Sequence, residues 1–370
     1  MKGTVLYRPK RHYCISHNII VMSDKVTIEH LKELQSAIKE QFIGLYKDNN
    51  EALRKIKSTT KIQGSSPCEE LVKLSQLIKA HTTKLGIILK PDTFTETNYM
   101  ATYKELKSFI DYVFFFFSLL PLFYGDKEYP EYMLKKLDQG AQELLSGMNV
   151  LSDELTRKFE ERESDEDRLL CVGMIWSSCD ALESIGQKGK YGLLADSIRE
   201  SNGLIDDVLG EVAEFLEEPC FNNGDMMDDG FSSDEEEDDA APSNLDDDPE
   251  TLEKLTKFVG QWQTKLKMIK LLLSSFVSTI SAKDYKSVNK KGSVLDDLHV
   301  EHSRITKDVD ELFGDIFMAD STFDAKDFQE PIDTLNSSMR SMIVVMKRLN
   351  DDDAKKSKWL NVWEAKYFEN

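Results

Sequence analysis

Residues 249–280, PETLEKLTKFVGQWQTKLKMIKLLLSSFVSTI, decide the fold class. Apolar side chains recur in this stretch at alternating spacings of three and four residues and fill two positions of a heptad. The first position holds Leu252, Val259, Leu266, Leu273 and Ile280, and the second holds Leu255, Trp262, Ile269 and Phe276. This period places one apolar stripe along a helix, so it predicts a long helix packed within a bundle.

The helical period extends over almost every structured stretch of the chain, and none shows the sustained alternation of a strand. We expect helices at about 27–47, 98–120, 193–217, 293–318 and 325–349, and further ones starting at Ser66, Pro130, Ser164 and Pro249. The prediction is an all-α protein of two packed helical bundles with about nine to ten helices.

The domain organisation follows from composition shifts along the chain. Residues 1–22 are expected to form a flexible tail, and the natural start is either Met1 or Met22. An N-terminal bundle is expected over 23–160 and a C-terminal bundle over 161–370. A disordered acidic loop at 218–249 is expected to interrupt the second bundle, because Gly, Asn, Ser and acids replace the helical pattern there.

The net charge of −20 comes from one part of the sequence. Of the 67 acidic residues, 21 lie between Glu200 and Glu253, a stretch without Lys or Arg. The remaining 46 acids nearly balance the 47 bases, so no clustered basic surface for nucleic acid is expected.

Two further features concern the compartment. The most apolar run, Val113–Leu120, ends at Pro121 and is far shorter than the roughly 20 residues that span a bilayer, so no membrane segment is predicted. The five cysteines form no C-x-x-C pair, which favours reduced thiols in the cytoplasm or nucleus.

The sequence offers no positive signal for catalysis, a cofactor or a metal. His299 and His302 are neighbours on a predicted helix, yet no further ligand motif accompanies them, and His302 is interpreted as a core histidine. Gly186–Lys190 lacks the spacing of a phosphate-binding loop and is predicted to be a turn. A non-enzymatic protein is therefore expected.

Several features favour an interaction protein. Ser232 and Ser233 each precede an acid by three residues, a pattern typical of acidophilic kinase sites, although a solubilising loop explains it as well. The acidic tract that follows, a candidate for contact with basic partners, is Asp234, Glu235, Glu236, Glu237, Asp238 and Asp239. Trp359 and Trp363 are candidate partner anchors, or they dock the C-terminal segment onto the bundle.

Two apolar stripes leave a choice between surface and core. Leu134, Leu137, Leu144 and other apolar residues up to Leu155 form about three heptads, which suit either a dimerising zipper or, as we favour, the core of a bundle. The stripe of Met339, Met342 and Met346 suits either an adaptable groove or, as we favour, core filling.

The order of several short blocks resembles the cyclin-D-binding protein family over most of residues 27–349. The blocks are Leu119-Leu120-Pro121, Leu134-Lys135-Lys136-Leu137, Gly140-Ala141, Gly147-Met148, Ile175-Trp176 with Cys179, Lys265–Lys270, and Leu295-Asp296-Asp297 to Asp310-Glu311-Leu312. The resemblance implies two talin/vinculin-like helical bundles. It also implies a regulatory role in nucleus and cytoplasm, through binding of cyclin D or helix-loop-helix proteins.

The first hypothesis is therefore an adaptor that binds cyclin-like or transcription-regulating proteins and influences cell-cycle progression or transcription. A cytoskeletal bundle adaptor and an acidic chaperone of basic proteins are the alternatives. The oligomeric state, the partner and the helical face that binds it are left open by the sequence.

Overall fold

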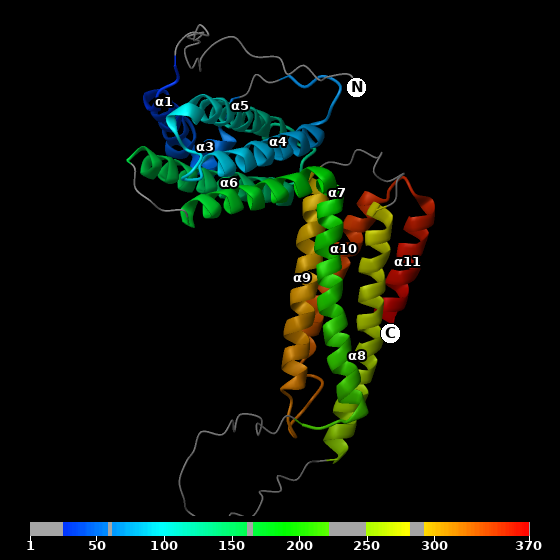
Figure 1. Ribbon diagram of the computed structural model, residues 1–370. Coiled ribbons are helices and arrows are strands. Elements are labelled where there is room, and N and C mark those ends of the chain that lie inside the picture. The colour runs from blue at the N-terminus through cyan, green and yellow to red at the C-terminus, as the bar shows by residue number, and fades with distance from the viewer. Residues whose placement is uncertain (1–24, 58–60, 161–165, 222–248, 282–291, 370) are drawn as a thin grey trace, which may run out of the picture. The chain divides into compact units, whose positions relative to one another are not determined.

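The computed structural model describes residues 25–57, 61–160, 166–221, 249–281 and 292–369. These residues form helices joined by turns, with no strand among them, which confirms the all-α prediction. The chain divides into two compact units, unit 1 (Met1–Leu193) and unit 2 (Leu194–Asn370) (Figure 1). The predicted tail at 1–22 and most of the predicted acidic loop lie outside the described residues.

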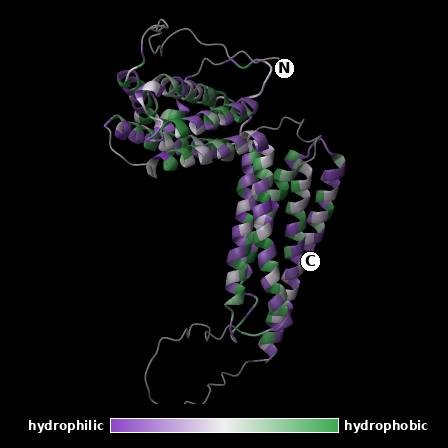
Figure 2. Cartoon of the chain, viewed as in Figure 1, coloured by the Kyte–Doolittle hydropathy of each residue, from purple (hydrophilic) through white to green (hydrophobic). Residues whose placement is uncertain are grey.

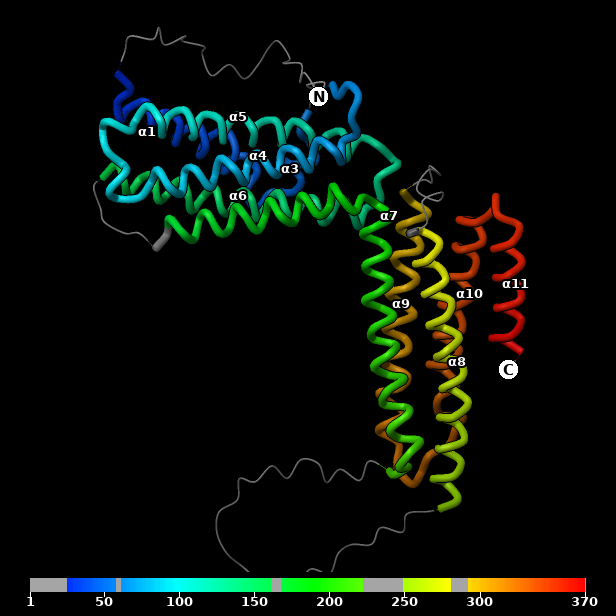
Figure 3. Tube along the Cα trace, turned by 45° about the vertical axis from the view of Figure 1, so that its right-hand side comes forward, coloured from blue at the N-terminus to red at the C-terminus, as the bar shows by residue number. Residues whose placement is uncertain are grey.

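Unit 1 is built from long helices that run side by side (Figure 3). Its elements are α1 (Ile28–Ile38), a π-helical turn (Lys39–Ile43), α2 (Gly44–Tyr46), α3 (Asn50–Arg54), α4 (Pro67–Ile88), a 3₁₀ turn (Glu96–Asn98), α5 (Tyr99–Tyr124), α6 (Glu131–Phe159) and the first half of α7 (Glu166–Glu217). The start signal at Ser66 is confirmed: its Oγ accepts a hydrogen bond from the Glu69 backbone at 3.2 Å, and the Glu69 carboxylate accepts one from the Ser66 backbone at 2.7 Å.

α5 extends further than the sequence suggests. The prediction ended this helix before Pro121, whereas the helix includes Pro121 and ends at Tyr124. Pro121 lacks the N–H that would donate to the carbonyl four residues earlier, but the helix continues for one more turn, and Gly125 N–H donates to the Pro121 carbonyl at 2.9 Å.

Two described helical stretches are long and apolar enough, by length and composition, to cross a membrane: Glu96–Tyr124 and Arg168–Glu217. This differs from the expectation based on Val113–Leu120, because the apolar pattern continues on both sides of that run. Half of the apolar window of the first stretch is buried inside the bundle, where Phe109 and Phe116 are fully covered. α5 is thus a core helix of unit 1.

The first half of α7 belongs to unit 1, so the division falls after Leu193 and not after 160 as the sequence suggested. Glycines let this half-helix approach its neighbours closely. A Cβ on Gly140 or Gly147 of α6 would lie 2.8 Å from Leu182 or 2.7 Å from Ile175, both on α7. The halves of α7 meet at Gly189, whose φ of 58° and ψ of −172° suit glycine alone. The predicted turn at Gly186–Lys190 is therefore an interruption of a helix.

We predict that Gly147→Val destabilises unit 1 by about 2 kcal/mol, a typical cost of overpacking a core. The new Cβ would lie 2.7 Å from Ile175 Cγ1 and 3.1 Å from the Ile175 backbone nitrogen, which cannot move without bending α7. Urea unfolding followed by circular dichroism measures the change. The matched control is Gly173→Val on the exposed side of α7, where a Cβ meets nothing within 4 Å. Equal stabilities of the two variants would contradict the prediction.

Unit 2 is a bundle of long helices that run side by side (Figures 1 and 3). Its elements are the second half of α7, α8 (Pro249–Ser281), α9 (Gly292–Phe317), α10 (Gln329–Leu349) and α11 (Ala354–Glu369). The heptad stripe of α8 lies in the core as predicted: every member is buried except Leu252, which is half-buried. The helices carry hydrophilic and hydrophobic residues in alternating bands, as amphipathic helices do (Figure 2).

The two open questions about apolar stripes are settled by burial. The residues from Leu134 to Leu155 at heptad spacing are buried inside unit 1, so this stripe is the core of a bundle and not a zipper surface. Met339, Met342 and Met346 are buried inside unit 2, which makes them core filling and not a groove. Both favoured predictions are confirmed.

Candidate functional site

A groove of about 500 Å³ runs along unit 2 between the second half of α7 and α9. Residues at helical spacing on the two walls form its floor, because positions three and four apart lie on the same helical face. The buried floor residues are Ser201, Ile205 and Val208 of α7 and His302, Thr306 and Val309 of α9. We call this feature the α7/α9 groove.

A short hydrogen-bonded chain lies in the floor of the α7/α9 groove. Ser201 Oγ lies 2.9 Å from His302 Nδ1, and His302 Nε2 lies 3.0 Å from His299 Nδ1. Burial, with the charge of His299 as a second cause, lowers the pKa of His302 from 6.5 to about 3. The His302 imidazole is therefore neutral at physiological pH, as expected of a core histidine. No group of three or more metal-ligating side chains occurs among the described residues.

The rim of the α7/α9 groove is acidic on both walls. Glu200, Asp207 and Glu211 of α7 and Asp310 of α9 are exposed, and none forms an ion pair within the described part of the chain. The one lysine of the rim, Lys307, pairs with Glu311 at 3.1 Å. The groove thus carries an excess of negative charge over a neutral floor.

Leu204 adds an apolar contact point to this rim. It stands between Glu200 and Asp207 on the outer face of α7, and 56% of its surface is exposed. The sequence prediction singled out His302 as a core histidine but did not predict this groove. The sequence signal that could have indicated the groove was Leu204. This apolar residue lies off the buried stripe of α7 and between acidic residues.

The predicted anchors Trp359 and Trp363 have different environments in α11. Trp363 is 3% exposed and donates its indole N–H to the Met268 carbonyl of α8 at 3.0 Å. Its ring stacks on that of Tyr367 in the same helix, with ring centroids 4.9 Å apart. Trp359 is 37% exposed and lines a hollow of about 220 Å³ with residues of α8 and α10. Trp363 therefore docks the C-terminal helix, whereas a partner-anchoring role for Trp359 stays a prediction.

The other predicted site residues lie outside the described residues. These are Ser232 and Ser233 and the acidic tract Asp234, Glu235, Glu236, Glu237, Asp238 and Asp239. The helices on either side have the predicted ends, since α7 stops at Glu217 and α8 begins at Pro249.

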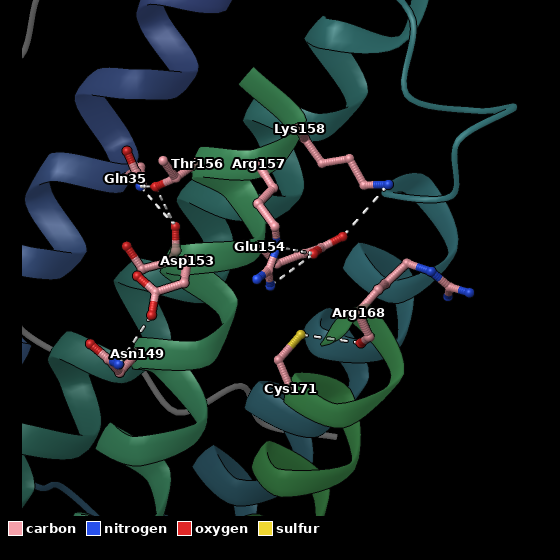
Figure 4. Close-up of polar contacts among 10 residues, drawn as sticks. Gln35, Asn149, Asp153, Glu154, Thr156, Arg157, Lys158, Arg168 and Cys171 are labelled. Carbon is pink, nitrogen blue, oxygen red and sulfur yellow. Dashed lines mark hydrogen bonds and ion pairs between the residues drawn. The ribbon is translucent and has the colours of Figure 1, made fainter. Parts of the chain in front are cut away.

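A buried charged cluster in unit 1 belongs to the packing of its helices. Figure 4 shows Arg157 and Lys158 of α6 pointing toward the buried carboxylate of Glu154, with ion-pair distances of 3.2 and 3.6 Å. Arg168 at the start of α7 donates to the Gly86 carbonyl of α4 at 2.7 Å. The ion pairs therefore neutralise the buried Glu154 within α6, and Arg168 ties the start of α7 to the end of α4.

Comparison with known proteins gives a consistent family assignment. A family model described as Grap2 and cyclin-D-interacting, N-terminal, matches residues 70–218, which include the α7 wall of the groove. The chain is similar to an uncharacterized protein of Saccharomyces cerevisiae, with 35% identity over 94% of this chain and 98% of the relative. It is also similar to an uncharacterized protein of Schizosaccharomyces pombe, with 22% identity over 81% of this chain and 84% of that relative. The chain belongs to the Grap2 and cyclin-D-interacting protein family.

Proposed function

We propose that the protein is a non-enzymatic adaptor. It binds cyclin-like or helix-loop-helix regulatory proteins in cytoplasm and nucleus and thereby influences cell-cycle progression or transcription. The observation that carries the proposal is the α7/α9 groove, with exposed Leu204 set among unpaired carboxylates on the rim described above. An exposed apolar side chain within a polar rim is the usual arrangement of a binding surface. The family name supplies the class of partner.

The polar groups of the groove support binding over catalysis. Ser201 and His302 resemble a nucleophile and a base, but the second nitrogen of His302 meets His299 and not an orienting carboxylate. Both residues lie within helices, where the backbone N–H groups are engaged in helical hydrogen bonds. They are therefore poorly placed to stabilise an oxyanion.

The test is direct binding of the purified full chain to a D-type cyclin, measured by titration calorimetry. We expect Leu204→Asp to weaken binding by at least about tenfold, since it places a charge at the centre of the contact. The control is Leu271→Asp on α8, where the leucine is 54% exposed and lies outside the groove. Binding that is absent in the natural sequence, or equal in the two variants, would refute the proposal.

The acidic segment is proposed to modulate this binding through phosphorylation of Ser232 and Ser233. The two alternative functions give different results in simple assays. A cytoskeletal adaptor should co-sediment with actin filaments, and an acidic chaperone should lose its binding to basic proteins when residues 220–248 are deleted. A groove-dependent adaptor should do neither.

A further inference from the structure

We infer that the α7/α9 groove receives a basic amphipathic helix of a partner protein, an inference that rests on the proposed function and specifies its ligand. The first argument is the construction of the walls. Both walls are helices, so their backbone hydrogen bonds are internal and neither wall offers a free edge to an extended peptide. Side chains must make the contact, and a helix laid between two helices is the mode of recognition that fits such walls.

The second argument concerns the length and the apolar part of the contact. The groove follows α7 from Ser197 to Glu211, a rise of about 20 Å at 1.5 Å per residue. A partner helix of about four turns matches this length. Ile205, Val208 and Val309 are buried beneath the groove, and Leu204, which is 56% exposed, provides its apolar contact point. A partner helix with apolar residues at spacings of three and four presents an apolar stripe to Leu204.

The third argument is charge. Glu200, Asp207 and Glu211 are spaced by seven and four residues, so they line one side of α7, and Asp310 lies on the opposite wall. Lysine or arginine residues flanking the apolar stripe of a partner helix would meet these carboxylates on both sides. Rim charges of this kind contribute to specificity and to the rate of association, while the apolar contact contributes most of the affinity.

The same charges argue against other occupants. A second copy of the chain docked groove to groove would bring identical carboxylates face to face across a two-fold axis, which is repulsive. Nucleic acids and anionic lipid surfaces carry the same sign as the rim and would be repelled as well. A basic helix is the occupant whose charge complements the groove.

The experiment measures binding of fluorescent synthetic helices to the full-length protein by anisotropy. The first peptide has a leucine stripe flanked by Lys and Arg, the second has Glu at the flanking positions, and the third has the composition of the first in a scrambled order. We expect the basic amphipathic peptide to bind at least about tenfold more tightly than either of the others, and its binding to weaken as salt rises. The scrambled peptide carries the same charge without the apolar stripe, so its affinity measures non-specific attraction to negative charge on the protein.

Charge-reversal variants locate the binding site. Asp207→Lys combined with Glu211→Lys is expected to reduce binding of the basic peptide about tenfold and to favour the acidic peptide. The matched control is Asp315→Lys combined with Asp333→Lys, two exposed acids of unit 2 outside the groove. If the basic peptide binds the groove variant and the control variant equally, or if the acidic and scrambled peptides bind as tightly as the basic one, the inference is wrong.

The outcomes separate this inference from the proposed function. Cyclin binding that depends on Leu204, without any preference for the basic peptide, would overturn the ligand assignment and leave the adaptor function standing. Groove-dependent binding of the basic peptide without cyclin binding would overturn the proposed partner and support the ligand assignment. A second copy in the groove would appear as a Leu204-dependent dimer in sedimentation, and this result also overturns the inference.

Discussion

Lowering the pH from 7 to 4 is expected to cost unit 2 about 3 kcal/mol of folding free energy through His302 alone. His302 is 1% exposed, and its burial, with the charge of His299 as a second cause, lowers its pKa from 6.5 to about 3. The folded protein therefore keeps this imidazole neutral over a range in which the unfolded chain protonates it.

The sign follows from proton uptake. Below about pH 6.5 the unfolded state binds a proton that the folded state does not, so acid favours unfolding. The contribution of His302 to stability is fully present above pH 6.5 and is lost progressively as the pH falls toward about 3. At pH 4 about 2.5 pH units of this window have been crossed, at about 1.4 kcal/mol each.

Urea unfolding at pH 7 and pH 4, followed by tryptophan fluorescence, measures this loss. Three of the four tryptophans, Trp262, Trp359 and Trp363, lie in unit 2 and report on it. His302→Gln keeps a hydrogen-bonding side chain without the titration and should reduce the acid loss by most of the expected amount. The control is His81→Gln in unit 1, which should leave the acid loss of unit 2 unchanged. An acid loss in His302→Gln equal to that of the natural sequence would contradict the prediction.

Replacing Trp363 with alanine is expected to destabilise unit 2 by about 3 kcal/mol, the usual cost of removing a buried tryptophan. The side chain loses its hydrogen bond to the Met268 carbonyl and its stacking on Tyr367. The hydrogen bond to Met268 holds α11 on α8, so its loss should loosen the helix and open its backbone to tryptic cleavage at Lys355, Lys356 and Lys358.

Trp359→Ala is the matched control, because Trp359 lies one turn earlier in the same helix and is 37% exposed. We expect it to change stability by less than about 1 kcal/mol, as a half-exposed side chain contributes less than a buried one. Denaturant unfolding and the rate of tryptic cleavage in α11 provide the two measurements. A reversed order of the two variants would show that Trp359, and not Trp363, docks the helix.

Much of the fold could be predicted from the sequence because helix packing leaves a local signal. The three-and-four spacing of α8, the Ser66 cap and the stripe from Leu134 to Leu155 each record which side of a helix is buried. The order of short blocks along the chain also indicated the family. The location of the excess charge is also a property of the sequence alone.

The candidate groove could not be predicted, because periodicity tells which face of a helix is apolar but not which helix covers it. Leu204 and Asp310 are about a hundred positions apart, and only the packing of α7 against α9 brings their helices together. The different environments of Trp359 and Trp363 arise in the same way. The two residues are four apart in sequence, and only the packing of α11 against α8 determines that one ring is buried and the other is 37% exposed.

The sequence by itself determined that the protein is helical, where each apolar face lies and where its negative charge is concentrated. Tertiary structure alone decided that the first half of α7 completes unit 1, that Ser201 is the distant partner of the buried His302, and that unpaired carboxylates surround Leu204. The physical reason is that helical period and charge are local along the chain, whereas burial, pKa and groove shape depend on neighbours that are distant in sequence.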